Sequence, residues 1–400
     1  MIPPTRFIGL DIHKEYLVAS GVDQNQNQVF GPVKVTWGRF ENWIQKNLDQ
    51  FDAVALEMTT NSWRVYDTLE PHVNSVTIVH PPDVALIVKA QVKTDKRAAL
   101  TLAKLHAAGL LPAIWVPDQR TRDIRALVSQ RQKMVRLSTQ AKNRLHAALH
   151  RHHFGIPEDG GLFAPENRAW WLELPVSKLE QTRIVADLDT LSFAIRQIAH
   201  LETAMEELGA EDESVPLLVQ IPGVGLLTAV TILGAIGTIY RFPEPRKLVG
   251  YAGLGASVHD SGKFHATGRI TKRGRRDLRT AMVGAANRAV QHHPHWKAEL
   301  ERLEPHLGRS KAIVAIARKL LVVVWHVLTK QAVDKHADPQ TVARAFFNHA
   351  YHHIGAQNMP EGIAVKDYVR QQMDRLGIGK DLTYVKWGSK RLKLPPSHLQ

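Results

Sequence analysis

The chain has 400 residues, more than a single hydrophobic core usually organises, so we expect two or three domains. Lysine and arginine number 52 against 38 acidic residues, and the formal net charge of +14 favours a polyanionic partner, most simply nucleic acid. The absence of cysteine excludes disulfides and thiolate metal sites and fits a cytoplasmic protein. No apolar run reaches about 18 residues and no secretory leader is evident, so no membrane partner is expected.

Residues 1–117 are predicted to form an α/β domain. Short β-branched runs stand at RFIGLDI, YLVASGV, VFGPVKVTW, FDAVALEM and VNSVTIVH, and helical patterns fill the gaps from about Phe40 onward. Three strands in quick succession, followed by alternation of helix and strand, indicate a mixed sheet with helices packed on it.

Three carboxylates of this region stand at the ends of predicted elements. Asp11 interrupts the apolar strand RFIGLDI, Glu57 ends the apolar run AVALE, and Asp95 lies where the helix in QVKTDKRAALTLAKL begins. A buried carboxylate without a partner is costly, so the three side chains together suggest a cage for Mg²⁺ or Mn²⁺. Two alternatives stay open: Thr94 or Asp95 as a plain helix N-cap, and Glu57 as an ordinary charge at a strand end.

Residues 118–212 are predicted to form two long helices. From Asp118 to about His153 the pattern is helical and strongly basic, with an apolar stripe on one face. After the break FGIPEDGGLFAP, a second helix is expected from about Val176 to Leu208. We expect a coiled-coil arm that serves oligomerisation and RNA contact, or else a helical layer packed on the same domain.

Residues 213–333 are predicted to be a mainly helical domain. The turn IPGVG, with Gly223 and Gly225, resembles a helix-hairpin-helix turn whose backbone N–H groups bind phosphate, although any tight turn between helices uses glycine. A β-ribbon or irregular loop follows and carries Ser261 in an Asp-Ser-Gly sequence. The cations of this stretch are candidates for DNA phosphate contact, or for a solvated charged face: Lys263, Arg269, Lys272, Arg273, Arg275 and Arg276.

Residues 334–400 form a C-terminal extension that is less patterned, and its sequence assigns it no chemistry. Aromatic rings among cations can stack on RNA bases. The candidates in the extension are Tyr384 and Trp387, near Lys386, Lys390 and Arg391. The alternative is a terminal segment held on the protein surface.

These motifs occur in the order found in the insertion-sequence 110 transposases, which the chain resembles over roughly residues 5 to 330. In that family an RNase H-like domain, similar to the RuvC Holliday-junction resolvase, carries the pattern Asp, Glu, Asp, Asp. The first three members map to Asp11, Glu57 and Asp95, but the fourth position is Ala98, which cannot bind a metal. IPGVG, RFPEPRKLVGYAGL and GRITKRG match the family's C-terminal transposase domain, and the resemblance identifies Ser261 as its nucleophilic serine.

The resemblance implies a DNA transposase or site-specific recombinase. Such an enzyme forms a covalent phosphoserine with donor and target DNA, uses Mg²⁺ or Mn²⁺ at its carboxylates, and is guided by a structured bridge RNA. Strand exchange needs at least two active sites, so we expect dimers that pair into a tetramer. We expect the protein in the bacterial cytoplasm, associated with the nucleoid. His259 and His265 are candidate proton carriers.

Three alternatives stay open. The first is a RuvC-like junction nuclease that uses metal-activated water and no serine. The second is a related DNA invertase that recombines without RNA. The third is a weakened form that binds DNA or RNA without cutting, because Ala98 replaces an acidic ligand.

Overall fold

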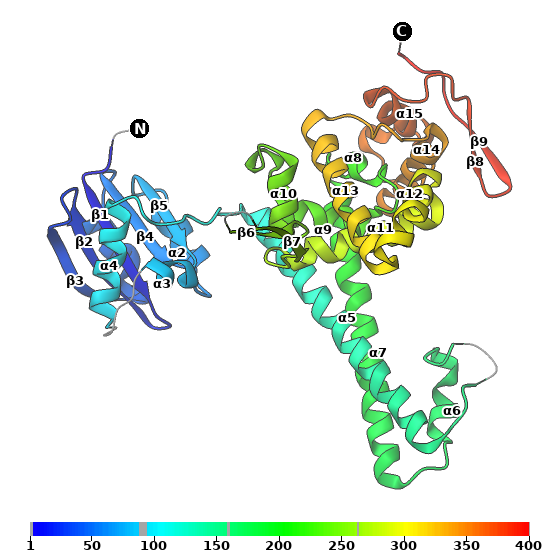
Figure 1. The fold of residues 1–400 in the computed structure, drawn as a ribbon, viewed down its shortest axis with the longest axis horizontal. Helices are drawn as coiled ribbons and strands as arrows, with labels where there is room; N and C mark the ends of the chain where they lie inside the picture. Colours follow the sequence, from blue (N-terminus) through cyan, green and yellow to red (C-terminus); the bar gives the residue numbers. More distant parts are fainter. Residues whose placement is uncertain (1–2, 88–93, 158–160, 262–263, 400) are drawn as a thin grey trace. The chain divides into compact units, whose positions relative to one another are not determined.

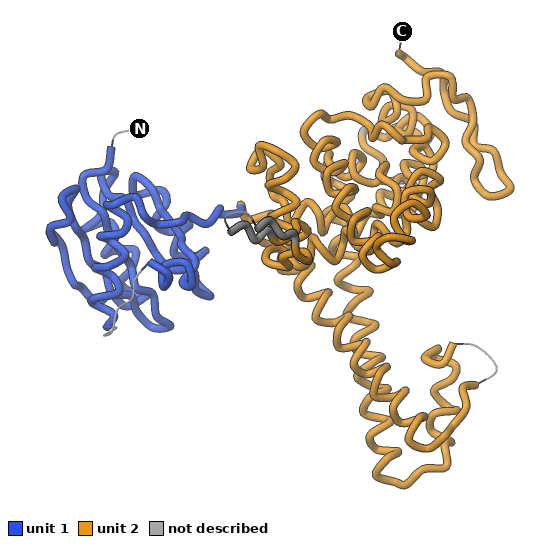
Figure 2. Tube along the Cα trace, in the orientation of Figure 1, with its two compact units in different colours: residues 1–117 blue, residues 118–400 orange. Residues whose placement is uncertain are grey.

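The structure, a computed structural model, describes residues 3–87, 94–157, 161–261 and 264–399 (Figure 1). The chain divides into two compact units, residues 1–117 and residues 118–400 (Figure 2). The first unit is a mixed sheet with helices and the second is mostly helical, which confirms the predicted fold class. The finer division of residues 118–400 at positions 212 and 333 stays a prediction.

A five-stranded sheet organises the first unit. Its strands are β1 (Arg6–Ile12), β2 (Tyr16–Asp23), β3 (Gln28–Thr36), β4 (Asp52–Glu57) and β5 (Ser75–Val79), in the spatial order β3-β2-β1-β4-β5. The first three strands pair antiparallel, whereas β1, β4 and β5 run parallel. Strands β1 and β4 are apolar along nearly their whole length because they lie at the centre of the sheet, where both faces are covered.

Alternation along β1 assigns its residues to two faces of the sheet. The helices of this unit are η1 (Trp37–Arg39), α1 (Phe40–Asn47), α2 (Ser62–Leu69), α3 (Pro81–Ile87) and α4 (Asp95–Ala107). Ile8 and Leu10 are fully buried in a core that includes Phe40 and Ile44 of α1. Gly9 faces the backbone of α4, and Asp11, two residues further along the strand, therefore lies on the same face as α4.

Two long antiparallel helices open the second unit, as predicted: α5 (Gln119–His152) and α7 (Lys178–Ala210). Asp118 and Ser177 cap them, each accepting a hydrogen bond from a backbone N–H of the first turn. Arginines of α5 pair with acids of α7, for example Arg144 with Asp187 at 2.6 Å. Part of the basic face predicted for α5 is therefore neutralised within the chain. Near the far end of the pair lie η2 (Pro165–Asn167) and α6 (Arg168–Leu172).

A large helical core fills the rest of the second unit. Its elements are α8 (Val215–Val219), α9 (Leu226–Ile236), η3 (Ile239–Arg241), α10 (Pro245–Tyr251), β6 (Ala256–Ser261), β7 (Phe264–Ile270), α11 (Arg276–His292), α12 (Pro294–Leu307), α13 (Arg309–Lys330), α14 (Pro339–His349), η4 (Ala350–Ile354), η5 (Pro360–Gly362), α15 (Val365–Arg375), β8 (Tyr384–Trp387) and β9 (Lys390–Lys393). Strands β6 and β7 pair antiparallel, so the predicted ribbon is present.

The C-terminal extension belongs to this core. Val342, Phe346 and Phe347 of α14 are buried in the same cluster as the residues of α13. Arg370 is also buried, and it donates hydrogen bonds to three backbone carbonyls of the extension. The surface-segment alternative is therefore wrong for these helices. The sequence signal was the spacing of apolar residues in α14, at 342, 343, 346 and 347.

The two aromatic candidates of the extension are already engaged within the chain. Trp387 is half-buried and packs against the rings of Phe347 and Tyr351. The guanidinium of Arg391 lies 4.9 Å from the centroid of Tyr384. Their stacking on RNA bases stays a prediction.

Helix α13 corrects one expectation from the sequence. By length and composition α13 is long and apolar enough to cross a membrane, and no other helix among the described residues meets both criteria. Half of its apolar window is buried inside the protein, as expected for a core helix. The run was missed because Arg318 and Lys319 interrupt it.

Candidate metal centre and nucleic-acid interface

The parallel pairing of β1 with β4 places two predicted ligands at one edge of the sheet. The register runs from Arg6 opposite Asp52 to Leu10 opposite Leu56, so Asp11 and Glu57 are the next residues on neighbouring strands. Both strands point the same way, so both carboxylates stand at their carboxyl ends.

Asp95 reaches this edge from the first turn of α4. Thr94 is the N-cap, and its hydroxyl accepts a hydrogen bond from the Arg97 N–H at 3.3 Å. Asp95 is therefore not needed as the cap, which leaves its carboxylate free to face the sheet. Tyr16, on β2, donates its hydroxyl hydrogen to Asp95 Oδ2 at 3.0 Å.

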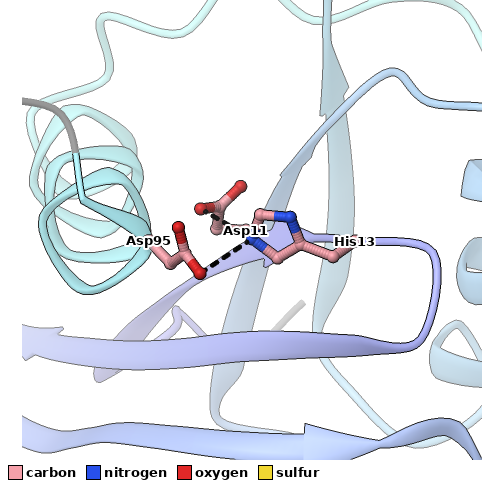
Figure 3. A group of neighbouring side chains, drawn as sticks. All are labelled: Asp11, His13 and Asp95. Atoms are coloured by element: carbon pink, nitrogen blue, oxygen red, sulfur yellow. Dashed lines mark ion pairs between the residues drawn. The ribbon is translucent and has the colours of Figure 1, made fainter.

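Asp11, Asp95 and His13 form one cluster (Figure 3). The Nε2 atom of His13 lies 3.3 Å from Asp11 Oδ2 and 3.3 Å from Asp95 Oδ2. One ligand atom from each residue lies within 4.8 Å of the others, which fits a common coordination sphere. The prediction from the sequence missed His13, although it stands only two residues after Asp11 in the turn that follows β1.

The electrostatics of the cluster favour a cation. Burial raises the pKa of Asp11, the negative charge of Asp95 raises it further, and the nearby His13 opposes both effects. Ionisation of Asp11 therefore costs more in the protein than in water, and a bound divalent cation would relieve that cost. The donor set and its spacing therefore fit a divalent metal ion, held by Asp11, Asp95 and the imidazole of His13.

The remaining two positions of the Asp, Glu, Asp, Asp pattern, Glu57 and Ala98, are not part of this cluster. Among the described residues, the group within 4.8 Å does not include Glu57, so its role as a ligand stays a prediction. The backbone carbonyl of Glu57 accepts a hydrogen bond from the Ser62 hydroxyl at 3.2 Å. Ala98 lies one helical turn after Asp95 and offers only a methyl group.

Gly9 sets the distance between β1 and α4, and a methyl group there is expected to disturb the cluster. A Cβ atom on Gly9 would clash with the carbonyl oxygen of Ala99 and stand 2.6 Å from the amide nitrogen of Ala103. Gly9→Ala should therefore destabilise the protein by about 1–3 kcal/mol and weaken metal binding, because α4 must move away from Asp11. Denaturant unfolding and metal titration of the full chain measure both effects.

Gly38→Ala is the matched control, since nothing lies within 4 Å of the Cβ position at Gly38. Unchanged stability and metal affinity in Gly9→Ala would show that the strand–helix contact does not hold the cluster together.

In the second unit, the two glycines of IPGVG have different environments. Gly223 has a φ of +83°, and a Cβ there would stand 2.9 Å from the amide nitrogen of Ala289. It is thus required for the close approach of the turn to α11. Gly225 is the N-cap of α9, has open space around it, and leaves the first turn without a side-chain cap.

Gly225 lies at a cavity of about 570 Å³ whose lining includes four arginines and two acidic residues. Its charged lining residues are Arg131, Arg136, Arg276, Arg288, Glu206 and Asp277. Arg131 is paired with Glu202, whereas Arg136 and Arg288 are exposed and have no carboxylate partner among the described residues. An uncapped helix N-terminus beside free arginines suits a phosphate group.

The predicted phosphate-binding residues after Ser261 separate into three groups. Exposed cations at the ribbon and its exit are Arg269, Lys272, Arg273 and Arg276. Arg275 is half-buried and bonds Asp277, with its Nε at 3.0 Å from Oδ1, so it is already paired within the chain. Lys263 lies outside the described residues.

Ser261 is the last residue of β6, and its backbone pairs with Phe264 of β7. The sequence predicted a β-ribbon or an irregular loop here, and the structure has a ribbon whose first strand ends at Ser261. His259 pairs with Ala266, and His265 pairs with Asp260, so both histidines belong to the same ribbon. The side chains of residues 258–267 lie outside the described part of the chain.

Comparison with known proteins decides the family. Two protein-family models match the chain. The model of the DEDD transposases of IS110, described as "Transposase", matches residues 8–154. The model of the "Transposase IS116/IS110/IS902 family" matches residues 215–301. The chain belongs to the IS110 family of transposases. Membership implies a DNA substrate. The DEDD match agrees with the RNase H-like fold expected of the first unit.

Curated relatives cover most of this transposase. It is 24% identical over 340 residues to the transposase for insertion sequence element IS1111A of Coxiella burnetii, covering 82% of this chain and 90% of that protein. It is 25% identical over 334 residues to the putative transposase y4qE of Sinorhizobium fredii, covering 81% of this chain and 79% of that protein. It is also 27% identical over 335 residues to the pilin gene-inverting protein of Moraxella bovis, covering 80% of this chain and 95% of that protein.

Proposed function

We propose that this transposase cuts and rejoins DNA strands through a covalent bond between Ser261 and a backbone phosphate, with a divalent metal ion held by Asp11 and Asp95. The observation that carries the proposal is the convergence of these two carboxylates at the edge of the sheet in a DEDD transposase unit. A relative named for pilin gene inversion supports a recombination reaction rather than simple hydrolysis.

The chemistry balances without an external energy source. The oxygen of Ser261 attacks phosphorus, the P–O bond to a deoxyribose oxygen breaks, and the proton from serine ends on that departing oxygen, which becomes a free deoxyribose hydroxyl. The new serine ester keeps the energy of the phosphodiester bond, so the reverse attack by another strand's hydroxyl rejoins DNA without ATP. When bound, a divalent cation would polarise the scissile phosphate.

The chain's own residues supply the other functions. Asp11 and Asp95 would hold the divalent cation, and His259 and His265 are the candidate proton carriers for Ser261. The carboxylates and the serine belong to different compact units, so the proposed reaction requires residues of both units to act on the same phosphate. Strand exchange between two duplexes needs at least two such sites, which favours a dimer or a pair of dimers.

We further propose that the cavity at Gly225 binds the backbone of DNA or of a guide RNA. Its free arginines and the N-terminus of α9 supply positive charge without reading sequence. The net charge of +14 is compatible with simultaneous binding of both nucleic acids.

Removal of Arg136 is expected to weaken nucleic-acid binding uniformly across sequences. Arg136→Ala should reduce the slope of log affinity against log salt concentration by about 1, because one phosphate contact is lost. Fluorescence anisotropy over a salt series measures the slope. Arg318→Ala, which removes an exposed arginine of α13 that does not line this cavity, is the control and should leave the slope unchanged. Equal slopes in wild type and Arg136→Ala would exclude a phosphate contact at this position.

The function itself is tested with labelled donor and target DNA and the full-length protein. Reactions contain or omit Mg²⁺ or Mn²⁺, and contain or omit structured RNA transcribed from the sequence that flanks the coding region. We expect recombinant joints with both metal and RNA. Joints without RNA would indicate an invertase-like reaction, and strand breaks without joints would indicate a junction nuclease.

A further inference from the structure

We infer that His13 is a metal ligand that takes the place of the missing fourth acid at Ala98. The inference rests on the proposed metal-dependent function and extends it to the ligand set. It explains how a DEDD site that has an alanine at its last position still offers three protein ligands from described residues: two carboxylates and one imidazole.

The imidazole of His13 lies where it could bind a metal ion together with Asp11 and Asp95. Its Nε2 is equidistant from Asp11 Oδ2 and Asp95 Oδ2, at 3.3 Å, and this atom is shielded from solvent. The nitrogen is close to both carboxylates at once, and this spacing is compatible with three ligand atoms around one ion.

Two contacts fix the ring in this position. The backbone N–H of His13 donates to the carbonyl oxygen of Tyr16 at 2.8 Å and closes the turn between β1 and β2. The ring of Tyr16 lies against that of His13, with centroids 4.7 Å apart and planes at 36°. Since Tyr16 also donates to Asp95, one side chain orients two members of the cluster. Outer contacts of this kind commonly hold ligands in place.

The exchange of a carboxylate for an imidazole changes which ion the site prefers. Mg²⁺ takes oxygen ligands in near-ideal octahedral geometry, whereas first-row transition metal ions accept imidazole nitrogen. A site with two carboxylates and one nitrogen also carries one negative charge fewer than a site with three carboxylates. We therefore expect Mn²⁺ to bind more tightly than Mg²⁺, and Ala98→Asp to narrow that difference.

The direct test is electron spin echo spectroscopy of Mn²⁺ bound to the full-length protein, which detects a nitrogen atom coordinated to the ion. We expect a ¹⁴N coupling in the wild type that disappears in His13→Gln, together with a loss of Mn²⁺ affinity of at least about tenfold. His80→Gln is the matched control, because His80 lies in the same unit with its Nδ1 3.7 Å from a carboxylate oxygen of Asp83. That variant should keep both coupling and affinity.

A second variant distinguishes the loss of a metal ligand from a loss of folding. His13→Gln combined with Ala98→Asp should regain Mn²⁺ affinity without regaining the nitrogen coupling, because a carboxylate one turn from Asp95 then replaces the imidazole.

The outcomes separate this inference from the proposed function. Mn²⁺ binding that needs Asp11 but shows no nitrogen coupling in the wild type, or keeps it in His13→Gln, overturns the role of His13 and leaves the carboxylate site standing. Mn²⁺ binding that is insensitive to Asp11→Asn overturns both.

Discussion

Asp11→Asn is expected to abolish metal-dependent DNA strand cleavage. The substitution keeps the shape of the side chain but removes the charge that would hold a divalent ion beside Asp95 and His13. The loss of rate should be at least about 10²-fold, the size seen when one preorganised electrostatic contact to a transition state is removed. Cleavage of end-labelled DNA, followed on a denaturing gel at several Mn²⁺ concentrations, measures the effect.

The same variant should fold at least as well as the wild type. Burial and the charge of Asp95 raise the pKa of Asp11, so its ionised form is less favourable in the native protein than in the unfolded chain. A neutral amide removes that cost, and the melting temperature should not fall. Asp83→Asn is the matched control, because Asp83 is an exposed carboxylate beside a histidine outside the cluster. A large fall in melting temperature in Asp11→Asn alone would instead indicate a structural role for Asp11.

Ser261→Ala is expected to eliminate the covalent protein–DNA adduct while leaving DNA binding and metal binding unchanged. The serine oxygen is the atom that forms the new bond to phosphorus, and alanine has none to replace it. Adducts resist denaturing electrophoresis, so a labelled strand that migrates with the protein reports the intermediate. The adduct should fall to background.

Ser257→Ala is the matched control for Ser261→Ala. Ser257 lies on the same strand, β6, and its hydroxyl donates to the Arg269 carbonyl at 3.1 Å. Loss of that bond should cost about 1 kcal/mol of stability and leave the adduct intact. Continued strand cleavage by Ser261→Ala, with no adduct in either protein, would favour attack by metal-activated water.

The strands and helices with a clear pattern of apolar residues could be predicted from the sequence. β1 and β4 are continuous apolar runs because they lie at the centre of the sheet, and α5 and α7 carry caps and a long helical period. The convergence of Asp11 with Asp95 also followed from the sequence, because a strand end and a helix start are both visible there.

Three features were not predictable from local pattern. His13 joins the cluster only because the tight turn after β1 brings it back toward α4, and one histidine among 21 gives no signal by itself. Gly223 appeared to be a turn residue, but its place is set by contact with α11, far along the chain. Arg275 was counted as a DNA contact, whereas its ion pair with Asp277 depends on side-chain geometry that composition does not reveal.

The most direct test of the account is peptide mapping of the adduct trapped with labelled DNA in the presence of Mn²⁺. Digestion with nuclease and protease, followed by mass spectrometry, should find a nucleotide remnant on Ser261 in the wild type and none in Asp11→Asn. A remnant on another residue, or a remnant on Ser261 that forms equally well in Asp11→Asn, would contradict a reaction in which the carboxylate cluster and this serine act on one phosphate.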